Sequence, residues 1–249
     1  MKISIISATL NSATYIRDCL ASINSQSYDN LEHIIIDGAS TDSTLERIKL
    51  TRTRVTKILS EPDKGIYDAI NKGLKMVTGD IVGFLHADDT FASTTILENI
   101  AETFINKTID GIYGNLVYIN TLNKVVRTWR SKPFHPKNVL HGWMPPHPTL
   151  FLRKEIYEKH GLFDTSFKIA GDYDFILRLM VDEEITLKYI PETITIMRMG
   201  GASNRNLMMI ARKSYEDYIA LKKNNVGGLN TLIMKNLQKI PQLFSKNVN

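Results

Sequence analysis

At 249 residues, with 43% hydrophobic and 23% charged residues, the chain has the size and composition of a soluble globular protein with a substantial core. Its single cysteine, Cys19, excludes an internal disulfide framework and a cysteine-rich zinc site, and it fits a reducing compartment. The first apolar run is too short for a signal peptide, and no stretch approaches the roughly 20 apolar residues of a membrane span, so we expect a soluble cytoplasmic chain.

The net charge of +5 is unevenly distributed along the sequence. From Arg198 onward nine cations face two carboxylates, a net +7, which leaves −2 for the rest of the chain. This asymmetry suggests an anionic partner at the C-terminal end. The basic residues come without the interleaved aromatic residues of a base-stacking platform, so we do not expect nucleic acid as that partner.

The first half of the chain alternates apolar runs with amphipathic segments. The apolar runs predict buried strands over residues 3–8, 31–36, 55–59 and 81–85. Helices are predicted over 12–25 and 94–106, and around a face formed by Ile66, Ala69, Ile70 and Leu74. This alternation indicates right-handed βαβ units and a mostly parallel sheet. The glycine-rich fingerprint of dinucleotide-binding folds is missing after the first strand, which argues against a nicotinamide dehydrogenase.

Two adjacent carboxylates, Asp88 and Asp89, follow the strand predicted over 81–85. Open α/β sheets bind their ligands at this end of the strands. Two neighbouring carboxylates repel each other unless a cation or a donor-rich ligand lies between them, and a hard divalent ion that carries substrate phosphates is the simplest such partner. A solvated Asp-Asp-Thr turn that caps the next helix is the alternative on this stretch alone.

Polar residues also follow the second and third predicted strands. Asp37 ends the second strand, and Ser40 and Thr41 follow, an arrangement that suits recognition of a base or ribose. Capping of the next helix by Ser40 or Thr41 is an alternative, although it does not explain Asp37. After the third strand, a charged loop containing Asp63 and Lys64 is placed to close over a ligand at the same edge.

Beyond residue 110 the pattern changes. Two strands are predicted over 111–119 and 125–129, followed by a long connection over 131–146, which is typical of a functional loop. We then expect a strand over 147–153, a helix over 154–159, a strand over 194–199, and helices over 205–223 and 229–244, the last interrupted near Pro241.

Two features of this second half admit both a structural and a functional interpretation. Asp172 is predicted at or just before a helix N-terminus, where it is either a cap or a general base. The last helix has one apolar face with lysines nearby, which suits either an anionic membrane surface or packing against the domain. That face and its lysines are Leu229, Leu232, Ile233, Leu237 and Ile240 with Lys235, Lys239 and Lys246.

Six stretches, in order, resemble the family 2 glycosyltransferases of the GT-A fold, with the closest likeness to bacterial enzymes that build O-antigen and exopolysaccharide. They are residues 7–11, 36–42, 61–73, 84–89, 147–151 and 170–178. The resemblance implies a Rossmann-like, mostly parallel sheet flanked by helices. It implies a glycosyltransferase domain over 1–203, with a nucleotide-sugar half at about 1–108 and an acceptor half at about 109–203, and a basic helical extension over 204–249.

The resemblance also implies the roles of individual residues. Asp172 matches the family's catalytic base, and Asp88 and Asp89 match the acidic motif that holds Mg²⁺ or Mn²⁺ on the sugar-nucleotide diphosphate. The residues implied to bind the nucleotide sugar are Thr9, Asn11, Asp37, Ser40, Asp63, Lys64, Asp88 and Arg198. Two positions depart from the pattern: His86 stands where many relatives have an acid, and Gly38 where many have a second Asp. UDP is the default nucleotide.

The implied reaction moves a hexose or N-acetylhexosamine from a nucleotide sugar to a lipid-linked saccharide. A carboxylate that deprotonates the acceptor in one displacement inverts the anomeric configuration, so an α-linked donor gives a β-linkage. The acceptor is expected to be a polyprenyl-diphosphate-linked saccharide at the cytoplasmic face of the bacterial inner membrane, with the basic tail in peripheral contact with it. Donor sugar, linkage position and oligomeric state stay open.

Three other classes of protein fit the same residues less well. A sugar nucleotidyltransferase should carry a glycine-rich basic loop after the first strand, where this chain has Thr9-Leu10-Asn11-Ser12. Another metal-dependent phosphate-processing enzyme, such as a phosphatase, usually places its nucleophilic Asp at the position of Thr9. A non-catalytic sugar-binding protein would not need a base at Asp172.

Overall fold

The computed structural model describes residues 1–51, 54–199, 207–239 and 242. Within these residues, nine strands form one sheet in the order β3-β2-β1-β4-β8-β6-β9-β5, with β7 paired to β6. The first part of this order is entirely parallel and consists of β1 (Ile3–Thr9), β2 (Leu31–Asp37), β3 (Val55–Ser60) and β4 (Ile81–Phe84). The strands predicted from the four apolar runs are thereby confirmed to within two residues.

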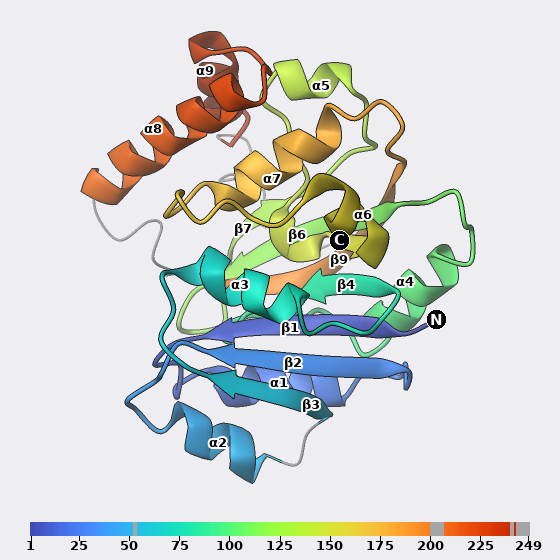
Figure 1. Cartoon of the computed structure of the whole chain (residues 1–249), viewed down its shortest axis with the longest axis vertical. Helices are drawn as coiled ribbons and strands as arrows, with labels where there is room; N and C mark the ends of the chain where they lie inside the picture. Colours follow the sequence, from blue (N-terminus) through green and yellow to red (C-terminus); the bar gives the residue numbers. More distant parts are fainter. Residues whose placement is uncertain (52–53, 200–206, 240–241, 243–249) are drawn as a thin grey trace.

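Helices cover both faces of this parallel part (Figure 1). Side chains alternate between the faces of a strand, so Ile6 packs with Ile70 and Leu74, while Ile5 packs with Cys19 on the other face. The helices that connect these strands and follow them are α1 (Ile16–Asn24), α2 (Thr44–Leu50), α3 (Ile66–Leu74) and α4 (Ile96–Thr103). The helix predicted from residue 12 begins only at Ile16, because residues 13–15 form a turn.

The second part of the sheet mixes directions. Its strands are β5 (Thr90–Phe91), β6 (Gly111–Ile119), β7 (Val125–Trp129), β8 (Phe151–Arg153) and β9 (Leu187–Arg198). β8 lies antiparallel between β4 and β6, and β6 runs parallel to β9. β6 and β7 confirm the predicted bounds, whereas β9 begins seven residues before the predicted strand at Ile194.

The long connection and the strand predicted after it differ from expectation. The connection contains a short helix, α5 (Lys137–Leu140), and residues 147–149 form a 3-10 turn, η1 (His147–Thr149). Only Phe151–Arg153 is a strand, because Pro148 has no N–H to donate to a neighbouring strand. Two further helices, α6 (Lys154–His160) and α7 (Gly171–Met180), follow.

The C-terminal helices pack on α7 rather than standing apart. These are α8 (Leu207–Lys223) and α9 (Leu229–Leu237), and Figure 1 shows them beside α5 and α7, away from β1, β2 and β3. The prediction that the apolar residues of α9 share one face is wrong, because they do not share one environment. Leu232 and Lys235 are buried against the domain, whereas Leu229, Ile233 and Leu237 are exposed. Arg205, Ile240, Pro241 and Lys246, which the sequence also implicated, lie outside the described residues.

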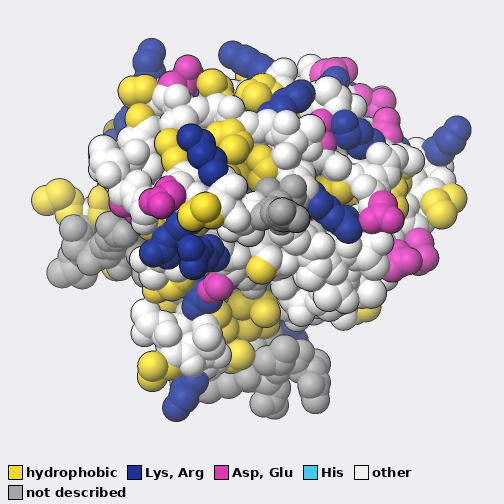
Figure 2. Space-filling model, turned by 90° about the horizontal axis from the view of Figure 1, so that it is seen from below, with side chains coloured by type: hydrophobic (Ala, Val, Ile, Leu, Met, Phe, Trp, Pro, Cys, Tyr) yellow, Lys and Arg dark blue, Asp and Glu magenta, His cyan; other side chains and the backbone are white. Residues whose placement is uncertain are grey.

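Much of the positive charge of the C-terminal helices is paired with carboxylates. Lys235 pairs with Asp217 at 2.7 Å, and Arg212 pairs with Glu216 at 3.0 Å. Lys223 reaches Asp164 at 2.7 Å. On the face shown in Figure 2, Lys and Arg side chains lie among Asp and Glu side chains. The charge asymmetry of the sequence is therefore partly balanced inside the fold.

No helix in the described part of the chain is long and apolar enough to cross a bilayer. Cys19 is buried and forms no disulfide.

Candidate functional site

The carboxyl ends of β1, β2 and β4 meet at one edge of the sheet. There the main chain of Gly38, just after β2, donates a hydrogen bond to the carbonyl of Thr9, the last residue of β1. Leu85, just after β4, bonds to the carbonyl of Ile6 in the same way. The loops that carry the predicted site residues therefore start side by side.

Asp37 organises the loop after β2. Its side chain is fully buried, and its carboxylate accepts hydrogen bonds from Ser40 N–H at 3.0 Å and from the hydroxyl of Ser60 at 2.7 Å. Ser40 in turn accepts from the main chain of Asn11 at 2.8 Å. Asp37, Ser40 and Asn11 thus form one network, in which Asp37 fixes the loop from inside.

Capping of α2 does not involve Ser40 or Thr41, which is a correction to the alternative raised by the sequence. Ser40 is engaged by Asp37, and the main chain of Thr41 donates to the Asn11 side chain at 2.9 Å. Asp42 accepts instead from the main chain of Thr44, the first residue of α2, at 3.0 Å.

The charged loop after β3 reaches the same edge. A side chain added at Gly38 would lie 3.0 Å from a carboxylate oxygen of Asp63, so Asp63 lies directly over Gly38. A larger residue at position 38 would therefore displace Asp63. Lys72 pairs with Asp63 at 2.6 Å, and Lys64 is exposed with its main chain bonded to Asp68.

The carboxyl groups of Asp88 and Asp89 differ in exposure. Asp88 is half-buried, whereas Asp89 is 1% exposed, and its Oδ1 has no hydrogen-bond partner among the described residues. Burial and the charge of Asp88 raise the pKa of Asp89 well above its usual value, against a smaller opposing effect of Arg198. Asp89 is therefore a buried carboxyl group whose charge needs a further cation.

Arg198 lies next to this pair, but its guanidinium is engaged elsewhere. It donates to Asp18 at 2.8 Å and to Asn123 at 2.6 Å, and it stacks 4.7 Å over the ring of Tyr15. A role at the diphosphate would require exchange of these contacts.

Two imidazoles, His86 and His147, lie within electrostatic reach of Asp172. Burial and the neighbouring His147 lower the pKa of His86 to about 4, while Asp88 and Asp172 raise it. Burial also lowers the pKa of His147, and Asp172 opposes this. Both rings are therefore neutral at pH 7. Because His86 responds to both Asp88 and Asp172, these two carboxylates converge on it from distant parts of the sequence.

Asp172 lies in the first turn of α7. Its Oδ1 accepts from the hydroxyl of Tyr67 at 3.3 Å and from the main chain of Tyr173 at 2.8 Å. The described residues donate no hydrogen bond to the other oxygen, and α7 has no side-chain cap. Asp172 therefore does not cap α7, and one of its oxygens keeps no hydrogen bond from the described residues.

Several residues that position Asp172 were not singled out from the sequence. Glu216 of α8 accepts hydrogen bonds from the main chains of Lys168, Ile169 and Ala170 at 3.0, 2.7 and 3.1 Å, just before α7. Burial raises the pKa of Glu216, but these N–H groups and Arg212 outweigh it, so the pKa lies below its usual value. One signal was available: Glu216 and Asp217 are the two carboxylates of an otherwise basic tail.

Gly171 and Tyr67 form the other support. A side chain at Gly171 would lie 2.8 Å from the ring of Tyr67, so only glycine permits this contact. The Tyr67 hydroxyl also donates to the carbonyl of Ile169 at 2.6 Å. These contacts join α3 to the start of α7.

A divalent metal fits the residues present. Among the described residues, no group of three His, Cys, Asp or Glu side chains forms a complete metal site. Mg²⁺ and Mn²⁺ in such enzymes, however, need only one or two carboxylates and take their other ligands from substrate phosphates and water. The unpartnered Oδ1 of Asp89 beside Asp88 supplies that donor set.

Comparison with known proteins agrees with this arrangement. The family model described as glycosyl transferase family 2 matches residues 4–170. An uncharacterized glycosyltransferase of Mycobacterium tuberculosis is 30% identical over 192 residues, which are 76% of this chain and 72% of the relative. The PGL/p-HBAD biosynthesis glycosyltransferase of Mycobacterium bovis is 28% identical over 207 residues, which are 81% of this chain and 78% of the relative.

Solved structures share the fold. Residues 1–349 of S. aureus TarS in complex with UDP-GlcNAc align with a TM-score of 0.69 at 19% identity, over 91% of this chain and 66% of that one. The chain thus spans slightly less than two thirds of that TarS fragment. The mannosyltransferase PcManGT of Pyrobaculum calidifontis, in complex with GDP-Man and Mn²⁺, aligns with a TM-score of 0.69 at 19% identity, over 98% of this chain and 73% of that one.

Proposed function

This chain belongs to glycosyl transferase family 2 and is a glycosyltransferase with a GT-A fold, and we propose that it moves a hexose or N-acetylhexosamine from a UDP-sugar to a lipid-linked saccharide with inversion. The observation that carries the proposal is that Asp172, from the start of α7, and Asp88, from the loop after β4, both act on the pKa of His86. The complexes of TarS with UDP-GlcNAc and of PcManGT with GDP-Man support a nucleotide-sugar donor.

In this proposal Asp172 takes the proton of the acceptor hydroxyl. One of its oxygens is held by Tyr67 and Tyr173, and the other receives no hydrogen bond from the described residues, which leaves it available to the acceptor hydroxyl. A base that acts in a single displacement inverts the anomeric centre, so an α-linked donor gives a β-linked product. Because the rings of His86 and His147 are neutral, they add no positive charge beside the base.

Asp88 and Asp89 hold Mn²⁺ or Mg²⁺ together with the donor diphosphate. Such an ion, when bound by these two carboxylates, would supply positive charge to offset the charge of the departing nucleoside diphosphate. Asn11, Ser40 and Asp63 border the nucleotide, with Thr9 and Lys64 beside them, and Asp37 keeps Ser40 in place. Arg198 lies close enough to Asp89 to oppose the rise in its pKa.

The acceptor in this proposal is a polyprenyl-diphosphate-linked saccharide at the cytoplasmic face of the inner membrane, as in O-antigen or exopolysaccharide assembly. Support for membrane contact comes from α9, where Leu229, Ile233 and Leu237 form one exposed stripe with exposed fractions of 62%, 49% and 51%. Lys222 lies beside Gly228, at the start of α9, and adds a cation for anionic lipid headgroups.

Calorimetric titration with UDP, GDP and dTDP, with and without Mn²⁺, tests the donor site. We expect Mn²⁺-dependent binding of UDP, which is lost when Asp88 and Asp89 are both changed to Ala. Asp172→Asn should keep this binding and lose sugar transfer. Nuclear magnetic resonance of the product should show a β-linkage, and an α-linkage would exclude Asp172 as the base of a single displacement.

Membrane contact needs point substitutions, because removal of α9 would also remove Lys235 and leave Asp217 without its partner. Ile233→Ser with Leu237→Ser should reduce co-sedimentation with vesicles that contain phosphatidylglycerol. Leu50→Ser, at an exposed leucine on α2, is the matched control. Equal co-sedimentation of all three proteins would exclude α9 as the contact.

A further inference from the structure

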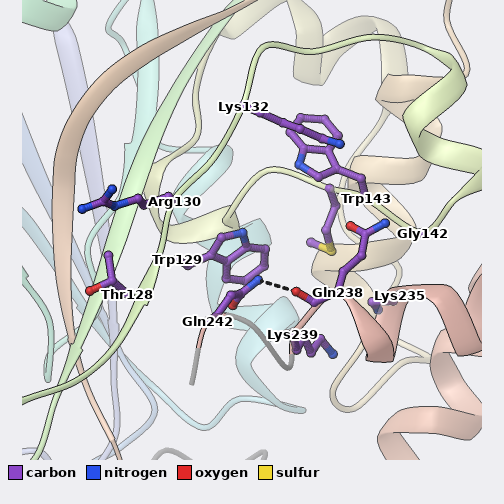
Figure 3. Close-up of a pocket in the computed structure, with 11 residues that line it drawn as sticks. Thr128, Trp129, Arg130, Lys132, Gly142, Trp143, Lys235, Gln238, Lys239 and Gln242 are labelled. Atoms are coloured by element: carbon purple, nitrogen blue, oxygen red, sulfur yellow. Dashed lines mark hydrogen bonds between the residues drawn. The ribbon is translucent and has the colours of Figure 1, made fainter. Parts of the chain in front are cut away.

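A cavity of about 480 Å³ lies on the α9 side of the molecule (Figure 3). It is called the α9 cavity below. It is bordered by the end of β7, the loop after α5 and the last turn of α9. In the view of Figure 3, Lys132 and Trp143 lie at one end and Lys239 at the other, with Trp129 between them. None of the proposed donor-site residues lines it.

The position of the loop after α5 against α9 shapes the cavity. Gly142 has a φ of +76°, and a side chain there would lie 2.6 Å from the main-chain nitrogen of Lys235. Glycine at this position therefore lets the loop approach the backbone of α9. The loop is further tied to α9 by Thr231, which donates to the carbonyl of Leu140 at 3.0 Å, and by Gln238, which donates to the carbonyl of His141 at 2.8 Å.

The lining of the cavity is positively charged. Four of the described lining residues are Lys or Arg and none is Asp or Glu. Lys235 is neutralised by Asp217, whereas Lys239 contacts only the neutral side chain of Asn236, at 3.4 Å, among the described residues. Burial lowers the pKa of Lys239, and the like charges of Lys235, Lys213 and Arg127 lower it as well, against the opposing charge of Asp217. A bound anion would relieve this repulsion.

Aromatic and amide groups complete the lining. Trp129 is half-buried, with the guanidinium of Arg127 5.6 Å from its ring, and Trp143 is stacked on Phe134. An indole face gives a flat apolar surface for the C–H face of a sugar ring. The Gln238 and Gln242 side chains supply both donors and acceptors for sugar hydroxyls.

One lining residue of the cavity contacts the helix that carries Asp172. Nζ of Lys235 lies 3.2 Å from the ring centroid of Tyr173, the residue after Asp172. Arg127, which lies over Trp129, also lies 4.7 Å from the ring centroid of Tyr118. Tyr118 in turn lies within the electrostatic reach of both Asp89 and Asp172. Asp172 also acts on the pKa of Lys235, so a ligand in the cavity would lie within electrostatic reach of the proposed base.

We propose that this cavity binds the phosphate-bearing end of the saccharide acceptor, with the sugar on Trp129 and the phosphate near Lys239. The proposal rests on the proposed function, because it takes Asp172 to be the base that the acceptor must reach. It assigns α9 to the recognition of the acceptor, a role outside the part of the chain that the family model covers.

Intrinsic fluorescence offers a specific readout, because the chain has two tryptophans and both line this cavity. The probes are N-acetylglucosamine 1-phosphate, N-acetylglucosamine, inorganic phosphate and vesicles that contain phosphatidylglycerol. We expect a saturable change with the sugar phosphate, at least tenfold weaker binding of the free sugar and of inorganic phosphate, and none with vesicles. Lys239→Gln should weaken the binding of the sugar phosphate at least fivefold, whereas Lys49→Gln on α2 should leave it unchanged.

UDP binding, measured on the same samples, separates this proposal from the proposed function. Intact UDP binding without a response to the sugar phosphate would overturn the acceptor site alone. Equal affinities for the sugar phosphate and the free sugar, or a response to vesicles only, would also overturn it. A response to the sugar phosphate without binding of any nucleotide would overturn the glycosyl-transfer proposal, and with it the assignment of the cavity to an acceptor.

Discussion

Nζ of Lys235 lies 2.7 Å from Oδ1 of Asp217, and both side chains are at most 5% exposed. Burial lowers the pKa of Lys235 to about 8, and the charge of Asp217 opposes this shift. The pair holds α9 against α8, beside the ring of Tyr173. A lysine of a basic tail thus contributes to the interior of the fold.

Asp217→Asn should destabilise the protein by about 3 kcal/mol at pH 7, because it leaves a buried ammonium group without its counter-charge. The loss should shrink above pH 8, where Lys235 is already neutral in the native state. Denaturant unfolding at pH 7 and at about pH 9 measures both values. Glu158→Gln, which breaks the exposed pair with Lys154, is the control and should cost less than about 1 kcal/mol. Equal losses for the two variants would contradict the prediction.

Glu216→Ala should lower kcat without weakening UDP binding. The substitution leaves the three N–H groups before α7 without their acceptor, so Asp172 loses its fixed position. We expect a fall in kcat on the order of 10- to 100-fold. Glu216→Gln keeps an acceptor oxygen and should recover most of the rate. If the Ala and Gln variants lost kcat equally, the charge of Glu216 rather than its hydrogen bonds would be responsible.

The sequence predicted the strands of the parallel part well, because each is a short apolar run between polar turns. Asp88 and Asp172 were both predicted at element ends, which the structure confirms for β4 and α7. The contacts of α9 could not be predicted. Helical spacing identifies an apolar stripe, but the side of α9 that packs is set by Asp217 and Tyr173, which lie on other helices.

The role of Asp37 shows a similar limit. A strand-end Asp is equally compatible with a ligand contact and with an internal network, and its position in the sequence does not separate these. The structure buries it completely and bonds it to Ser40, in the loop after β2, and to Ser60, at the end of β3. Ser60 ends β3, so its contact with Asp37 depends on the pairing of β2 with β3.

Asp89→Asn should stabilise the metal-free protein while it abolishes stabilisation by Mn²⁺ and UDP. The pKa of Asp89 is raised in the native state, so at pH 7 the native state pays for ionising it, and stability falls as pH rises above the ordinary value of 3.8. Removing this charge should add about 1–2 kcal/mol at pH 7. The gain should fade toward pH 4, where the carboxyl group is protonated in the native state.

Thermal unfolding with and without Mn²⁺ and UDP checks this prediction. The wild type should gain Tm on addition of both ligands, and the Asp89→Asn variant should not. Asp29→Asn, at a carboxylate that is 93% exposed, is the control and should leave both measurements unchanged. A lower Tm of the metal-free Asp89→Asn variant would show that the Asp89 carboxylate stabilises the fold.

Binding of N-acetylglucosamine 1-phosphate in the α9 cavity should weaken as pH rises through neutrality. Burial and the charges of Lys235, Lys213 and Arg127, against the opposing charge of Asp217, together lower the pKa of Lys239 to about 7. A phosphate binds the protonated lysine, so the affinity should fall by up to about tenfold for each pH unit above about pH 7. The second ionisation of a phosphate monoester, near pH 6, makes the ligand more negative, so below about pH 7 the affinity should rise with pH.

Tryptophan fluorescence titrations from about pH 6 to about pH 9 measure the profile. Lys239→Gln should remove this step, leaving only the later fall caused by Lys235 near pH 8, while Lys49→Gln should keep both. A wild-type affinity that stays flat across this range would show that the phosphate does not contact Lys239.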